Sequence, residues 1–315
     1  MNSHSEINHD LIEALQSTGM LIRLNTSSFG TQATDREKSR EVTDNAQASS
    51  DAARVVVNRL PGKAKLYHAK LTKTQSLARQ IINDMTTPWD ESGWRLLLTT
   101  RFDELARSLS LVKKDFDAGL TALSANADEV ISDAKAALGD LGANVRMPTK
   151  EDMINSYSMK TDIVPIPDGA QFRNLPPSTK TLLQHRLDKQ IEAAYQRGVE
   201  SIMERVKPMM TSVVERLDAY DGRLAAQAQG EEVGRTGAFR DTLVYNIAPV
   251  AELVGSLAAV TKDARLTELH TKLTQIVQHK PDEIRADDAA RQHVKQNAHD
   301  ALALFDEWDL SRLSA

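Results

Sequence analysis

The stretch FDELARSLSLVKKDFDAGLTALSANADEVISDAKAAL, residues 102–138, decides how this chain folds. Its apolar residues recur every three or four positions, with one gap at Asn126 and Ala127, and this period indicates a helix with one buried face. A single helix over the whole stretch would be about 55 Å long. Near-heptad spacing at that length favours an antiparallel helical hairpin or a coiled coil. The repeating positions are Phe102, Leu105, Leu109, Val112, Phe116, Leu120, Leu123, Val130, Ala134 and Leu138.

Similar patterns lie on both sides of this stretch. Residues 63–85 place their apolar side chains on one helix face, and Pro88 ends that helix because the residue before a proline avoids the α region. Downstream, Ser178 or Thr179 caps a second long helix that continues to about residue 224 and contains Pro208, which should kink it. Further helices are predicted near 238–260 (around Pro249), over 265–278 and over 282–308.

Two segments read as extended instead. GMLIRLNTSSFG (19–30) is short, bounded by glycines and partly alternating, which predicts a strand. KTDIVPIPDGAQFRNLPPS (160–178) is proline-rich and predicts an edge strand, because proline lacks the ladder N–H. Thr34 with Glu37, and Thr149 with Asp152, have the spacing of capping boxes at helix starts.

The predicted fold class is therefore mainly α. We expect an elongated bundle of long antiparallel coiled-coil-like helices, with a small extended or β element formed by the segments near 19–30 and 160–173. The predicted organisation is an N-terminal tail (1–18), a helical domain with a long helical hairpin (19–225) and a C-terminal helical segment packing on it (226–315).

Composition limits the classes of function. The chain has 315 residues, a formal net charge of −5 and no cysteine, which excludes disulfides, thiolate nucleophiles and cysteine-based zinc sites. Aromatic residues make up only 4 %, which favours long helices packed through aliphatic side chains. We find neither a signal peptide nor an uninterrupted apolar stretch of about 20 residues, so we expect a cytoplasmic protein.

Motifs for catalysis are absent from the sequence. There is no G-x-x-x-x-G-K-[ST], G-x-G-x-x-G, G-x-S-x-G or H-E-x-x-H. LPGKAK (60–65) has a Gly-Lys pair but lacks the first glycine and the following Ser or Thr of a phosphate-binding loop. We therefore expect no enzyme activity, and we assign no catalytic, cofactor-binding or metal-binding residues. An enzyme whose site is dispersed along the chain is the third and weakest hypothesis.

A basic segment between residues 54 and 79 contains no Asp or Glu. Such a segment can neutralise phosphates, and an interleaved aromatic ring can stack on a base. It can also be a solvated helix face that pairs with acidic side chains elsewhere in the bundle, or a contact surface for a protein partner. The candidate contact residues are Arg54, Arg59, Lys63, Lys65, Tyr67, Lys70, Lys73 and Arg79.

TTPWDESGWRLL (86–97) differs from the helical sequence around it. Its two tryptophans could form an exposed hot spot for a partner, or fill a buried corner where two helices diverge. We favour the corner, in which the glycine permits the turn and the arginine pairs or stacks. The corner residues are Pro88, Trp89, Gly93, Trp94 and Arg95.

The same stretch begins a series of motifs that resembles an uncharacterised helical family of phages and prophages, a domain of unknown function. The series covers about residues 20–225 and departs from the family pattern at Leu98 and Met147. The corresponding residues after Pro88, Trp89, Gly93, Arg95 and Leu96 are Leu138, Gly139 and Leu141, then Met147 (where the family commonly has tyrosine), Pro148 and Thr149, and finally Pro165, Ile166, Pro167, Phe172 and Arg173.

The resemblance implies a class of partner but no catalytic residue. Members of the family are often encoded beside a MoxR- or cobaltochelatase-like AAA+ ATPase and a von Willebrand A-domain protein. We therefore predict a non-enzymatic phage helical interaction or scaffold protein that acts in the cytoplasm of an infected bacterial host. Its predicted role is that of an adaptor or partner of an AAA+ remodelling ATPase. We also predict that this chain self-assembles into a homo-oligomer. The alternative is a nucleic-acid-binding protein that uses segment 54–79 in phage replication, recombination or transcription.

Overall fold

The computed structural model describes residues 8–143, 145–168, 174–230 and 240–308. Over these residues the chain is mainly helical, with a small antiparallel sheet. The chain forms two compact units that are each discontinuous in sequence, whereas the sequence analysis divided it into consecutive segments. Unit 1 comprises Met1–Arg23, Asn83–Asp103 and Ile163–Ala315, and unit 2 comprises Leu24–Ile82 and Glu104–Asp162.

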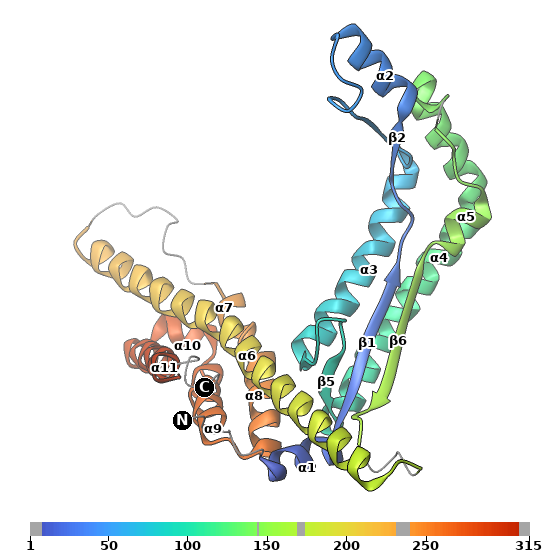
Figure 1. The fold of residues 1–315 in the computed structure, drawn as a ribbon. Coiled ribbons are helices and arrows are strands. Elements are labelled where there is room, and N and C mark those ends of the chain that lie inside the picture. The colour runs from blue at the N-terminus through green and yellow to red at the C-terminus, as the bar shows by residue number, and fades with distance from the viewer. Residues whose placement is uncertain (1–7, 144, 169–173, 231–239, 309–315) are drawn as a thin grey trace. The chain divides into compact units, whose positions relative to one another are not determined.

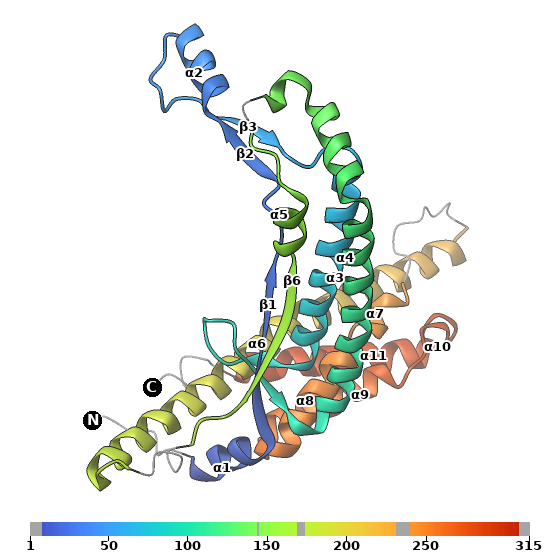
Figure 2. The same ribbon diagram turned by 90° about the vertical axis from the view of Figure 1, so that its right-hand side faces the viewer.

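Unit 2 contains the two long helices α3 and α4, which lie side by side along the strands β1 and β6 (Figures 1 and 2). Helix α4 is one continuous helix over the 102–138 stretch, and α3 begins and ends at the predicted residues. Strand β6 and helices α3 and α4 each continue a short way into unit 1, and β1 is divided between the two units after Arg23. The elements are β1 (Gly19–Ser27), β2 (Gln32–Asp35), α2 (Arg36–Asn45), β3 (Val55–Asn58), α3 (Lys63–Met85), α4 (Phe102–Leu138), the 3-10 turn Gly139–Gly142, α5 (Lys150–Asn155) and β6 (Ser158–Pro165).

The core of unit 2 forms where α3 meets α4. Leu71 and Ala78 of α3 are buried with Val112 and Phe116 of α4. A Cβ atom at Gly119 of α4 would lie 3.1 Å from Leu71 Cδ2, so the absence of a side chain there lets the two helices approach closely.

A buried amide fastens α3 to the strands. The Gln75 side chain is 5 % exposed, and its Nε2 donates to the carbonyls of Ser27 (2.7 Å) on β1 and Ser158 (3.0 Å) on β6. One glutamine thus satisfies two strand carbonyls at once, which ties the sheet to the middle of the helix.

Helix starts in unit 2 rely on side-chain caps. Helix α3 begins after Gly62, which has φ of +63°, and its first N–H, of Lys63, donates to Asp133 Oδ2 of α4 at 2.8 Å. The predicted capping box at Thr149 is confirmed, because Thr149 and Asp152 exchange both hydrogen bonds at the start of α5. The box predicted from Thr34 is wrong. Thr34 lies in β2, and the Asp35 carboxylate caps α2 by accepting from the Lys38 N–H.

Unit 1 is built around α6, a continuous helix of 52 residues, about 78 Å long at 1.5 Å per residue. It runs through Pro208 without interruption. It begins at Pro177, one residue before the predicted cap, because a proline fits the first turn of a helix, where its missing N–H has no partner to lose. The elements are α1 (His9–Thr18), β4 (Thr87–Pro88), β5 (Arg95–Leu98), the 3-10 turn Thr99–Arg101, α6 (Pro177–Ala228), α7 (Thr242–Tyr245), α8 (Ala248–Thr261), α9 (Ala264–Val277), α10 (Pro281–Ala286) and α11 (Asp288–Glu307).

Two of the predicted C-terminal helices are each split in two. The helix predicted near 238–260 breaks between α7 and α8, and Pro249 lies in the first turn of α8 instead of the interior of a helix. The last helix breaks between α10 and α11 at Asp287, whose extended backbone and carboxylate cap α11.

The helices of unit 1 share one hydrophobic core. Helix α8 packs on α9, α11 packs on both α6 and α9, and α1 packs on α6 and α8. Among the described residues, one segment, Thr242–Thr261, has the length and apolar composition of a membrane span. It comprises α7 and α8, and Leu253, Val254 and Leu257 lie in this core, so burial against other helices accounts for its apolar character.

The strands form a sheet in the order β4-β5-β1-β6. Strand β1 pairs antiparallel with β5, with Gly19 opposite Leu98 and Ile22 opposite Arg95. The strand predicted at 19–30 is thus β1, and β6 is an edge strand as predicted, while residues 169–173 lie outside the described part of the chain. A Cβ at Gly19 would lie 2.6 Å from the backbone carbonyl oxygen of Leu15, so this position requires glycine. A separate sheet pairs β2 with β3.

Candidate functional site

The basic segment is not one continuous surface. Arg54 and Arg59 flank β3, while the remaining candidate residues lie on α3. The Arg54 Nε donates to Thr34 Oγ1 at 2.7 Å. The Arg59 guanidinium donates to the Gly30 carbonyl and lies 4.4 Å from the centre of the Phe29 ring. Both arginines therefore hold the β2–β3 sheet and the chain leading into it.

Two further basic side chains of the segment have partners within unit 2. The exposed Lys63 ammonium pairs with the Glu129 carboxylate of α4, and this hydrogen bond raises the pKa of Lys63. The Arg79 guanidinium donates to Thr26 Oγ1 on β1 at 3.0 Å. These contacts match the interpretation in which basic side chains serve partners elsewhere in the fold.

Tyr67 does not present an open ring for stacking. It is half-buried and packs against the core of unit 2. Its neighbour His68 is joined to Tyr157 by a 2.8 Å hydrogen bond between Nδ1 and Oη, and burial lowers the pKa of His68. Burial also raises the pKa of Tyr157 to about 12. This side of α3 is therefore structural.

The opposite side of α3 is exposed and combines lysines with leucines. Leu66 is 71 % exposed and Leu77 is 44 % exposed. Steps of four, three and four residues connect Leu66, Lys70, Lys73 and Leu77, so these side chains share one helix face. Lys65 borders that face. We call Lys65, Leu66, Lys70, Lys73 and Leu77 the α3 stripe.

No acidic side chain neutralises the α3 stripe within the described residues. Its three lysines take part in none of the ion pairs found there, and α3 has no Asp or Glu before Asp84. The stripe is therefore a positive surface with two exposed apolar side chains. The sequence analysis named the lysines but missed Leu66 and Leu77. The sequence contained a pattern that could have identified these two leucines, because each precedes a core position by one residue and the two lie three helical turns apart.

The stretch predicted as a corner between helices is a β-hairpin. Helix α3 ends at Met85, and β4 and β5 pair with Thr87 opposite Leu96 and Pro88 opposite Arg95. Gly93 has φ of +91°, a conformation that favours glycine, and the Trp89 N–H donates to the Trp94 carbonyl at 2.9 Å across the loop. The turn thus connects two strands of a sheet, although the sequence periodicity did not predict a strand here.

The side chains of the hairpin are held within unit 1. Trp89 is buried in the core, and Trp94 packs against it with the Arg23 guanidinium 4.5 Å from the centre of its ring. Arg95 donates to Thr86 Oγ1 at 2.7 Å and to the Thr86 carbonyl at 3.0 Å. Burial, with a smaller contribution from nearby Arg205, lowers the pKa of Arg95 to about 10. The hairpin therefore does not form an exposed aromatic surface.

The described residues do not form a metal-binding site. No group of three or more His, Asp or Glu side chains lies there in a position to hold a metal ion. The motif residues Phe172 and Arg173 lie outside the described residues.

No family model, curated protein or solved structure matches this chain. The chemistry of the α3 stripe and its surroundings is therefore the basis for assigning a function.

Proposed function

We propose that the protein is a non-enzymatic helical interaction protein, and that the α3 stripe binds an acidic, partly apolar surface of a protein partner. The observation that supports this most directly is the pairing of exposed Leu66 and Leu77 with lysines that have no acidic partner in the described part of the chain. Lysines attract an acidic surface and set its orientation, while burial of the leucines supplies affinity. Burying an exposed leucine contributes about 1.5–3 kcal/mol.

The nucleic-acid alternative has less support. Of the cations in segment 54–79, Arg54, Arg59, Lys63 and Arg79 already hold partners within unit 2. Three lysines would neutralise about three phosphates, which gives a salt dependence far weaker than that of proteins with six to ten phosphate contacts. The leucines gain nothing from a phosphate backbone. A protein surface uses both parts of the stripe.

The partner class follows from the resemblance described above. We propose an AAA+ remodelling ATPase as the partner, with this chain acting as its adaptor in the cytoplasm of an infected bacterium. Helices α3 and α4, which are 23 and 37 residues long, would act as a coiled-coil-like support that presents the stripe. Self-assembly into a homo-oligomer is the second form of protein contact that we propose to test.

The experiment compares two triple variants with the same change in net charge. The stripe variant carries Lys65→Glu, Lys70→Glu and Lys73→Glu. Lys63 is left intact because its reversal would face Glu129. The control variant reverses three exposed lysines elsewhere in unit 2, which are Lys114, Lys135 and Lys160. The tagged proteins are used to recover partners from infected cells, and light scattering gives their oligomeric state.

We expect the stripe variant to lose an ATPase or another defined partner that the wild type and the control variant both retain. A second variant, Leu66→Gln with Leu77→Gln, should lower the affinity for the same partner about tenfold or more. Filter binding to single- and double-stranded DNA at low and moderate salt tests the alternative. DNA binding that the lysine reversals abolish and the leucine changes leave intact would overturn the proposal, as would equal partner recovery by the stripe and control variants.

A further inference from the structure

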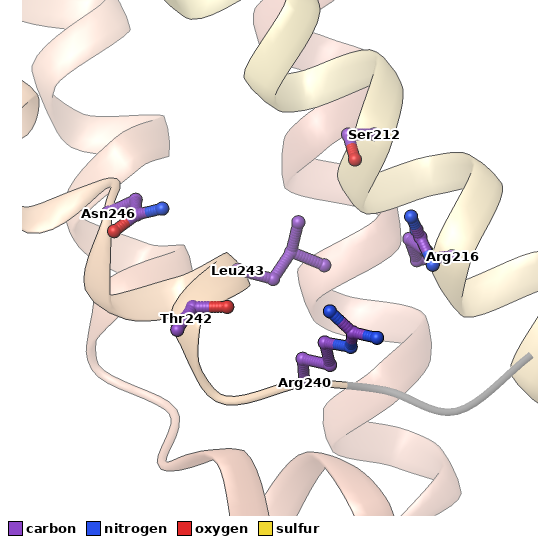
Figure 3. Close-up of a pocket in the computed structure, with 6 residues that line it drawn as sticks. All are labelled: Ser212, Arg216, Arg240, Thr242, Leu243 and Asn246. Carbon is purple, nitrogen blue, oxygen red and sulfur yellow. The ribbon is translucent and has the colours of Figure 1, made fainter. Parts of the chain in front are cut away.

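A small cavity in unit 1 lies between α6 and the short helix α7. Its volume is about 190 Å³, and it is lined by Ser212, Arg216, Arg240, Thr242, Leu243 and Asn246 (Figure 3). Figure 3 shows both arginine side chains on one side of the cavity and Leu243 projecting toward its middle. The α3 stripe belongs to the other unit, so the cavity is independent of the proposed function.

The two guanidiniums of the cavity have no acceptor among the described residues. Nearby carboxylates are directed elsewhere. Asp241 pairs with Arg285, and Glu215 precedes Arg216 on α6, where adjacent side chains diverge by about 100°. Two like charges in one cavity repel each other, and an anion bound between them would remove that repulsion.

The remaining polar side chains of the cavity also suit an anion. The Ser212 and Thr242 hydroxyls and the Asn246 amide can donate hydrogen bonds, and no carboxylate lines the cavity among the described residues. A carboxylate ligand has two oxygens and a single charge, which one arginine fork can satisfy. Two forks and additional donors match a dianion with three or four oxygens.

The volume of the cavity further limits which ligands it can hold. Cavities that enclose drug-sized ligands have volumes of about 300–1,000 Å³. The volume here lies below that range. A single phosphate group fits within such a space, whereas the rest of a nucleotide would have to project out of it. We infer that this cavity binds a phosphate group, as inorganic phosphate or as the terminal phosphate of a small phosphomonoester.

Calorimetric titration of the full chain at constant ionic strength tests this inference. Inorganic phosphate should bind saturably with one site per chain, and acetate should bind at least tenfold more weakly. Glycerol 3-phosphate distinguishes the two sources. Binding comparable to phosphate indicates a phosphomonoester ligand, and its exclusion indicates free phosphate. Absence of saturable phosphate binding, or acetate binding as tight as phosphate binding, would overturn the inference.

Neutral variants locate the binding in the cavity. Arg216→Gln and Arg240→Gln should each weaken phosphate binding about ten- to hundredfold, the range expected for loss of a charge-assisted hydrogen bond. The control is Arg186→Gln, which removes an exposed arginine of the same helix about 45 Å away and should change nothing.

Thermal unfolding should be unchanged in Arg186→Gln and unchanged or slightly raised in the two cavity variants, because the cavity arginines hold no partner in the described part of the chain and repel each other. The wild-type protein offers an independent test. Phosphate should shift the Nε–H resonances of Arg216 and Arg240, and unchanged resonances at saturation, or full binding by the double variant, would contradict the assignment.

Discussion

Replacing Arg291 by methionine removes a buried cation from the junction of α6, α10 and α11, and we expect unit 1 to lose about 2–4 kcal/mol of stability. The side chain is 8 % exposed. Its Nε donates to Asp221 Oδ1 of α6 at 2.8 Å, and one terminal nitrogen donates to Asp288 at 2.9 Å. The other donates to the carbonyls of Ile284 and Arg285 at 3.2 Å.

The magnitude follows from how exposed each partner is. Breaking a fully buried ion pair costs about 3–5 kcal/mol. The Asp221 side chain is 26 % exposed, which lowers its share, and Asp288 is 72 % exposed and contributes at most a few tenths of a kcal/mol. The two carbonyls add about 1 kcal/mol or more if they stay without a donor. Methionine fills most of the vacated volume, so a cavity adds little.

Tryptophan fluorescence measures this effect selectively. The chain has three tryptophans, and Trp89, Trp94 and Trp308 all belong to unit 1. Urea unfolding followed by fluorescence should show the loss in free energy, and thermal unfolding should shift by about 4–15 °C. Arg291→Lys keeps the charge but not the planar fork, so its loss should be intermediate.

The matched control is Arg186→Met, which changes an exposed arginine of α6 and should stay within about 0.5 kcal/mol of the wild type. The reasoning is refuted if Arg291→Met is as stable as this control. A double-mutant cycle with Asp221→Asn should give a coupling of about 1–3 kcal/mol, and additivity would show that the ion pair does not fasten α11 to α6.

Three further predictions concern other contacts. Gln75→Leu leaves two strand carbonyls without their donor and should destabilise unit 2 by about 1–3 kcal/mol, seen in far-ultraviolet circular dichroism before any change in tryptophan fluorescence. The pKa of Tyr157 is about 12 in the fold, above the usual value near 10, so its neutral form stabilises unit 2 below pH 10 by an amount that disappears as pH rises from 10 to 12. Absorbance of tyrosinate should show a late titration near pH 12 that Tyr157→Phe removes, whereas Tyr195, whose pKa burial raises further, should still titrate later. Gly255→Ala brings a Cβ within 2.5 Å of the His270 ring, and we expect a net loss of about 1–2 kcal/mol by urea unfolding, with no loss if the ring moves freely.

Much of the fold could be predicted because it is encoded locally. Helices α3 and α4 repeat their buried positions over 23 and 37 residues, which indicates the helical period, although the pattern alone did not show that residues 102–138 form one continuous helix. The capping box at Thr149 needs only residues three apart. Strand β1 was visible from its alternation between glycines, and the prolines of the 160–178 segment placed β6 at an edge.

The features that sequence analysis missed depend on distant partners. Strand β5 is four residues long and almost entirely buried, so it shows no alternation, and its pairing with β1 joins residues about 75 positions apart. The same limit applies to the basic segment. Nothing near Lys63 in sequence reveals that Glu129 pairs with it, whereas Lys70 looks equivalent and has no such partner. Local pattern identified the charges, and only the tertiary fold separated those held internally from those left at the surface.

Unit 1 has an N-terminal helix that packs on elements made much later. Helix α1 ends at Thr18, while its neighbour α8 begins at Ala248. At about 5–20 residues per second, a ribosome takes roughly 10–50 s to extend the chain between them. Throughout that interval Leu11, Ile12 and Leu15 have no completed core to enter. The apolar face of α1 therefore stays uncovered on the nascent chain until both of its neighbours, α6 and α8, have been made.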